Sequence, residues 1–126
     1  MLSYSTVGVK DIAKAQEFYD PLLADLDAKV VMRRPDGGFI AYSNSDGAMF
    51  SIATPFDGGE ASAGNGNMVA FACKDAAQVK QMCEKARSLG ATCEGELGPR
   101  VGGMVTCGYV RDPDGNKLNF FCMGSE

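Results

Sequence analysis

Histidine and tryptophan are both absent from the 126 residues of this chain. Histidine is the side chain that most often carries protons near neutral pH and most often binds transition metals. Its absence excludes every histidine-based catalytic triad and argues against a transition-metal site. Any general base would have to be a carboxylate, tyrosine, lysine or cysteine with a shifted pKa.

The chain also lacks a basic cluster, a basic leader and a long apolar run. Its formal net charge of -4 argues against nucleic acid, because that binding depends on clustered Lys and Arg. No segment approaches the roughly 18 apolar residues that a membrane span requires. We therefore expect a cytoplasmic protein that binds neither nucleic acid nor a membrane.

A disulfide framework is not indicated either. The five cysteines are odd in number and contain no C-x-x-C pair, which is typical of reduced intracellular thiols: Cys73, Cys83, Cys93, Cys107 and Cys122. We expect most of them to be small core residues. No histidine or predicted helix N-terminus is placed to activate Cys107 as a nucleophile.

Present instead is a strong turn signal near the C-terminus, in residues 112–116, which read D-P-D-G-N. Proline fixes φ, aspartate can bond its own backbone and glycine accepts positive φ. In the following run Leu118 and Phe120 alternate with Asn119 and Phe121. This alternation predicts a strand with an apolar back and a mixed front.

The first half of the chain predicts one strand, one helix and three further strands. Residues 4–9 form the first strand, and Asp11 can cap a helix that runs to about residue 27. Pro21 lies inside that helix and is expected to bend or break it. The three strands are predicted at 29–34, 39–43 and 48–54.

The second half repeats this pattern. Strand 67–73 precedes a helix capped by Asp75 and closed near Gly90, and strands follow at 92–96, 104–111 and 117–123. We predict an α+β fold made of tandem βαβββ modules within a single domain, residues 1–126. Module one covers about 1–54, a Gly-rich linker 55–66, and module two about 67–126.

A single helix can cover only one face of each set of strands. Large residues fall on the face expected to meet the helix: Val7, Val9, Phe50, Ile52, Val69, Phe71, Leu118 and Phe120. The opposite face carries mostly small or polar residues: Tyr4, Thr6, Gly8, Met49, Ser51, Ala53, Met68, Ala70, Ala72, Asn119 and Phe121. A sheet that curves toward this second face would enclose a cavity. Alternatively, the small residues only make room for loops or for the other module.

Three segments, at 7–20, 54–72 and 109–120, together resemble the glyoxalase, bleomycin-resistance protein and extradiol dioxygenase superfamily, also called vicinal oxygen chelate proteins. They read V-G-V-K-D-I-A-K-A-Q-E-F-Y-D, then T-P-F-D-G leading to G-N-G-N-M-V-A-F-A, then Y-V-R-D-P-D-G-N-K-L-N-F. The resemblance implies paired modules that curve into a mixed sheet around a central cavity, often in a homodimer. It also implies a divalent metal held by the first and last strands of each module.

The residues at the corresponding metal positions differ from those typical of the superfamily. Tyr4 and Met68 stand where relatives often carry histidine, and Ser51 and Asn119 stand where they usually carry glutamate. None of these four side chains is ionised near pH 7, whereas a divalent cation favours carboxylate or imidazole ligands. We therefore predict no bound metal and no cofactor, with these residues lining a ligand cavity.

Further ligand-binding candidates are Thr6 and Phe121, on the same face, and Arg100, on a glycine-rich loop that can close on an anion. Arg33, Arg34 and Arg111 end strands near the expected cavity mouth. Glu94, Glu96 and Asp112 are candidate bases, although solvated surface carboxylates are the simpler interpretation.

The sequence favours a metal-independent, glyoxalase-like protein that binds a small molecule and is a homodimer. One alternative is a lyase, isomerase or dioxygenase of the same superfamily, such as a lactoylglutathione lyase-like enzyme, that holds metal through other residues. Another is a resistance protein of the bleomycin type that sequesters a drug without reaction. The ligand and any catalysed reaction are not defined by the sequence.

Overall fold

The computed structural model describes residues 1–126. The first half contains β1 (Tyr4–Gly8), α1 (Ile12–Ala24), β2 (Lys29–Arg33), β3 (Phe39–Ser43) and β4 (Met49–Ala53). The second contains β5 (Val69–Ala72), α2 (Ala76–Ser88), β6 (Thr92–Cys93), β7 (Gly98–Arg100), a 3-10 turn (Val101–Gly103), β8 (Val105–Arg111) and β9 (Lys117–Met123). The α+β prediction is confirmed, and β7 is an addition to it.

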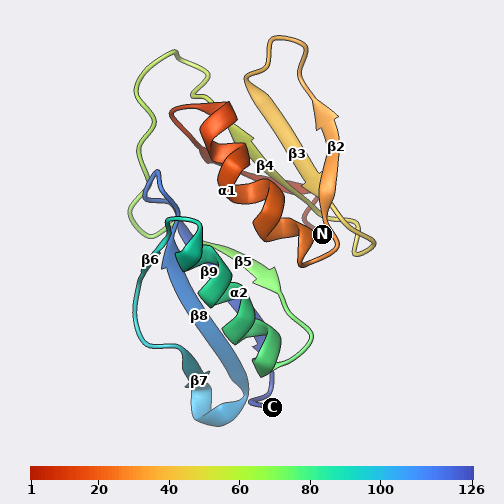
Figure 1. The fold of residues 1–126 in the computed structure, drawn as a ribbon, viewed down its shortest axis with the longest axis vertical. Coiled ribbons are helices and arrows are strands. Elements are labelled where there is room, and N and C mark those ends of the chain that lie inside the picture. The colour runs from red at the N-terminus through yellow and green to blue at the C-terminus, as the bar shows by residue number, and fades with distance from the viewer.

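The strands form two mixed sheets with the same internal order. Strands β1-β4-β3-β2 make the first sheet and β5-β9-β8-β6 the second, with β7 paired to β8. The pairs β1–β4 and β5–β9 are parallel, and all others are antiparallel. Both helices lie on the same side of the sheets, so each sheet has a covered back face and an open front face (Figure 1).

Helix α1 begins as predicted and passes through Pro21 without a break. Its N-cap, Asp11, accepts a hydrogen bond from the backbone N–H of Lys14 at 3.1 Å. Pro21 removes one backbone bond, but the helix runs unbroken from Ile12 to Ala24. The residues on both sides of the proline are buried in the core and hold the helix together: Phe18, Tyr19, Leu22 and Leu23. Of the two effects expected of Pro21, a bend or a break, the break does not occur.

One hydrophobic core runs through both halves of the molecule. A chain of aromatic contacts joins Tyr19 to Phe50, Phe50 to Phe71 and Phe71 to Phe120, with ring centroids 5.0, 5.0 and 5.9 Å apart. All eight residues predicted for the back face belong to this core or pack against it. The large residues therefore decide which face each helix covers.

The turn at 112–116 fastens the second half to the first. The Tyr19 hydroxyl donates to the Asp112 carboxylate at 2.5 Å, and the Asn116 amide donates to the backbone oxygen of Gly8 at 2.8 Å. Asp112 is only 4% exposed, and it also accepts hydrogen bonds from Asp114 and Asn116. The Asp112 carboxylate is therefore neither solvated nor free to act as a base. Its oxygens are occupied by hydrogen bonds, one of which joins the two halves of the chain.

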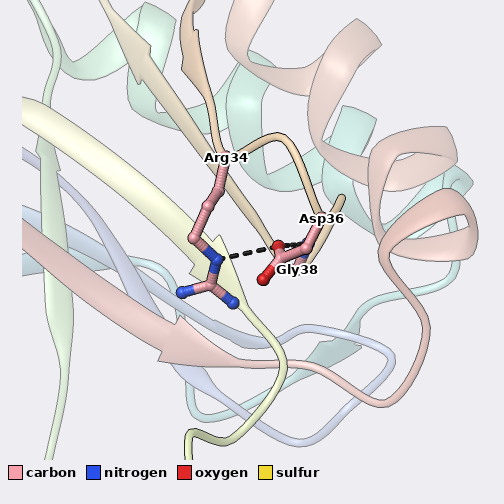
Figure 2. A network of polar contacts seen from close by, with 3 residues as sticks. All are labelled: Arg34, Asp36 and Gly38. Carbon is pink, nitrogen blue, oxygen red and sulfur yellow. Dashed lines mark hydrogen bonds and ion pairs between the residues drawn. The ribbon is translucent and has the colours of Figure 1, made fainter.

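Local backbone geometry explains the early end of one predicted strand and the closure of one hairpin. The strand predicted at 92–96 ends at Cys93, and Gly95 adopts a φ of 114° that a strand does not allow. The hairpin between β2 and β3 is closed by Asp36, whose Oδ1 accepts from Arg34 Nε and from the Gly38 N–H, each at 2.8 Å (Figure 2). Arg34 is thus held within its own turn.

Candidate functional site

Ser51 lies at the centre of the front face of the first sheet, between Thr6 on β1 and Ala41 on β3. Its side chain is fully buried, and its hydroxyl oxygen has no hydrogen-bond partner. The rings of Tyr4 and Phe39 meet edge to face with centroids 6.3 Å apart. The strand register places these two residues opposite the two ends of β4, so their rings meet above Ser51.

The unpartnered hydroxyl gives a first testable prediction. Ser51→Ala should raise the free energy of unfolding by about 1 kcal/mol, because it removes a buried polar group that forms no hydrogen bond. Urea denaturation measures the change. Thr106→Val is the matched comparison, because it removes a buried hydroxyl that does donate, to the Gly124 oxygen, and it should therefore lower the free energy of unfolding. A loss of stability in Ser51→Ala would show that the hydroxyl has a partner in solution.

Asn119 occupies the matching position on β9 and is 3% exposed. Its side-chain oxygen accepts from the Gly108 N–H at 3.3 Å, and its amide nitrogen contacts the Cys107 sulfur at 3.7 Å. Both ends of the amide are therefore directed to the neighbouring strand β8.

The four residues at the superfamily's usual metal positions do not fit a divalent cation. Ser51 and Asn119 are buried within the sheets, while Tyr4 on β1 and Met68 just before β5 are 53% and 44% exposed. Their phenol, hydroxyl, thioether and amide groups supply no anionic or imidazole ligand. Elsewhere in the chain, no three His, Cys, Asp or Glu side chains gather closely enough to hold a metal ion.

Arg100 is the last residue of β7, not a loop residue as predicted, and it is bound to its own segment and the loop before it. Its guanidinium donates to the backbone oxygens of Gly98 and Pro99 at 3.1 and 3.0 Å and to that of Glu96, and it lies 5.8 Å from the Tyr109 ring centroid. A hydrogen bond with Cys107 raises the pKa of Tyr109, which favours the neutral phenol. The strand carries a cation, but its donors are directed to carbonyls of the same segment.

Of the other ionisable candidates, Arg111 and Glu94 pair with each other, whereas Arg33 and Glu96 are exposed. Arg111 donates to Glu94 at 3.0 Å and thereby lowers the pKa of that carboxyl. Burial raises the pKa of the Cys83 thiol to about 12, which disfavours the thiolate. None of the five cysteines is in a disulfide.

An apolar crevice of about 490 Å³ lies at the seam between the two halves. It is bounded by the end of α1, the first sheet and β5, and 14 of its 18 lining residues are hydrophobic. Tyr4 and Met68 are brought together here, whereas Ser51, Asn119, Phe121 and Arg100 lie outside it. We call this space the seam crevice.

Sequence reasoning missed most of the crevice wall. Three wall residues, Phe50, Val69 and Phe71, belong to the face that the sequence assigned to the helix side of the sheets. Their periodicity shows that they face a helix, but not that the core is open between β1 and β5. The partial exposure of Leu26, Val69 and Phe71 is visible only in the folded chain.

A family model for the Glyoxalase/Bleomycin resistance protein/Dioxygenase superfamily matches residues 2–120. The chain belongs to this superfamily. Among curated proteins, none matches the sequence. Neither helix of this superfamily member is long and apolar enough to cross a membrane.

Solved structures agree with this assignment. A glyoxalase/bleomycin resistance protein from Albidiferax ferrireducens T118 is 31% identical, with 97% of this chain and 98% of that chain covered and a TM-score of 0.85. A lactoylglutathione lyase from Agrobacterium tumefaciens is 18% identical, with 97% and 92% covered and a TM-score of 0.70. At that identity the second likeness shows the fold alone.

Proposed function

We propose that this glyoxalase-superfamily protein binds a small, largely apolar molecule in the seam crevice. The observation that supports this most directly is an apolar space of about 490 Å³, within the size range of small-molecule sites. Tyr4 and Met68 stand at the seam, where a phenol and a thioether can contact an apolar or aromatic ligand. The binding needs no metal, since neither residue is a ligand for a hard cation.

Binding of a neutral fluorescent probe tests the proposal. N-phenyl-1-naphthylamine should give a saturable rise in emission with the native protein, because transfer of its rings into the apolar crevice removes them from water. Ala70→Phe should weaken this binding about tenfold or more, because Ala70 lines the crevice and a ring there occupies its volume.

The matched control is Ala13→Phe, which adds the same ring at an exposed position of α1 outside the crevice. This variant should bind the probe as the native protein does. Equal binding by Ala70→Phe and Ala13→Phe, or a signal that never saturates, would exclude the seam crevice as the site.

We further propose that the front faces associate in a homodimer. Four apolar side chains on these faces are largely exposed in the single chain: Tyr4, Met32, Met68 and Met123. A second copy would bury them, which is favourable at about 25 cal/mol per Å² of apolar surface. Sedimentation equilibrium measures the mass, and a Met32→Glu substitution should shift it toward the monomer.

A further inference from the structure

A second cavity lies at the other end of the seam and differs from the crevice in chemistry. It has a volume of about 450 Å³, opens to solvent, and is lined by the linker segment 62–67, the end of β1 and the starts of β5 and β9. Only 4 of its 12 lining residues are hydrophobic. We call it the linker pocket.

Four polar side chains of the linker pocket make no hydrogen bond or ion pair within the chain. They are Thr6 on β1, Ser62 and Asn67 in the linker, and Lys117 on β9. The fifth, Asn116, differs, because its amide donates to the Gly8 oxygen and to Asp112. Thus Asn116 is a structural residue, whereas the other four can donate to a ligand.

The backbone of the linker adds further donors. No N–H group from Ser62 to Gly66 donates a hydrogen bond to another part of the chain. Gly66 has a φ of 91°, a conformation that favours glycine, and the Asn67 amide folds so closely over Gly64 that a Cβ there would lie 2.0 Å from its nitrogen. Both positions therefore favour glycine, and the linker N–H groups have no acceptor within the chain.

The charge of the pocket is positive although the chain carries a net charge of -4. Lys117 is the one ionised residue in its lining, and no Asp or Glu lines it. The Lys117 ammonium lies 5.1 Å from the Tyr109 ring centroid, a contact that uses no hydrogen-bond donor. A lysine, neutral donors and unpaired N–H groups are the groups that bind oxyanions.

We propose that the linker pocket binds an oxyanion, either a carboxylate or a phosphate. Lys117 supplies the charge, and Thr6, Ser62, Asn67 and the linker N–H groups supply the hydrogen bonds. The pocket shares Met68 and Val69 with the seam crevice. A ligand that carries both an acid group and an apolar part can therefore reach both spaces.

Titration with sodium phosphate and with sodium acetate, followed by amide NMR at constant ionic strength in sodium chloride, tests the site. The amide signals of Ser62 to Gly66 should shift in a saturable way with at least one of the two anions, and the tighter one identifies the acid. Lys117→Gln should weaken binding about tenfold, the loss of one charge-assisted contact. Lys29→Gln, which removes an exposed lysine of β2, should bind like the native protein.

Three results would overturn the oxyanion site: linker signals that do not saturate with either anion, signals that respond equally to chloride, or equal affinity of the Lys117→Gln and Lys29→Gln variants. The spectra themselves report whether each variant is folded. A failure here leaves binding of the neutral probe in the crevice unaffected, so the two proposals are tested separately.

Joint use of both spaces rests on the proposed function and has its own test. Hexyl phosphate should bind at least tenfold more tightly than inorganic phosphate, because its chain enters the seam crevice. Ala70→Phe should remove this gain and leave inorganic phosphate binding unchanged, whereas Lys117→Gln should weaken both. If Ala70→Phe still binds hexyl phosphate tenfold more tightly than inorganic phosphate, the hexyl chain does not enter the seam crevice.

Discussion

Replacement of Tyr19 with phenylalanine is expected to lower the free energy of unfolding by about 2 to 3 kcal/mol, the cost of removing a donor from a buried charged acceptor. The Tyr19 hydroxyl donates to Asp112, and the two side chains are 1% and 4% exposed. Burial and the nearby Asp112 charge raise the pKa of Tyr19 well above its usual range, so it remains protonated and can donate.

Tyr42→Phe is a matched control for this prediction. The Tyr42 hydroxyl also donates to a carboxylate, that of Asp20, at the same distance of 2.5 Å. Asp20 is exposed, so water can replace the lost donor, and we expect a cost below about 1 kcal/mol. Urea denaturation of both variants measures the difference. Equal losses would mean that the Asp112 carboxylate is as well hydrated as that of Asp20, contrary to its burial.

Gly108→Ala is expected to destabilise the fold by about 2 to 3 kcal/mol, in the range found for overpacked cores. Gly108 lies on β8, and a Cβ there would be 2.2 Å from the Cys83 sulfur and 3.3 Å from a methyl group of Val79. Both neighbours are buried residues of α2, so the added methyl group requires the helix to move away from the sheet.

Cys83→Ala provides the test of this mechanism, because it removes the sulfur that the new methyl group would meet. The double variant should be more stable than Gly108→Ala alone, with a coupling energy of about 1 kcal/mol or more. Gly8→Ala is the control, since a Cβ at that strand glycine meets only Ala61 at an ordinary 3.7 Å. If Cys83→Ala gives no recovery, the strain lies in the backbone rather than in this contact.

Local sequence patterns determined the elements of this protein and the face that each helix covers. Asp11 and Asp75 cap the two helices, accepting from Lys14 and Gln78, as their positions before the apolar stripes predict. The alternation in β9 correctly places Leu118 and Phe120 in the core. Caps and periodicity involve residues a few positions apart, so one segment contains the whole signal.

The family was also accessible from the sequence, since three ordered segments carry the resemblance and the family model spans residues 2–120. The sequence was less informative about what surrounds the residues at the superfamily's usual metal positions. The sequence places Ser51 and Asn119 on the front face, but not the rings above Ser51 or the contacts of Asn119 with β8. These depend on the rotamers of side chains from other strands.

Only the tertiary structure decided where the open spaces lie and how the halves are joined. Tyr19 and Asp112 are 93 positions apart, and no local pattern pairs them. The seam crevice and the linker pocket likewise exist because β1 and β5 are edges of separate sheets. Periodicity assigns a residue to one face of a sheet, but it does not encode the distance between two sheets. That distance determines whether a core residue is covered or lines a cavity.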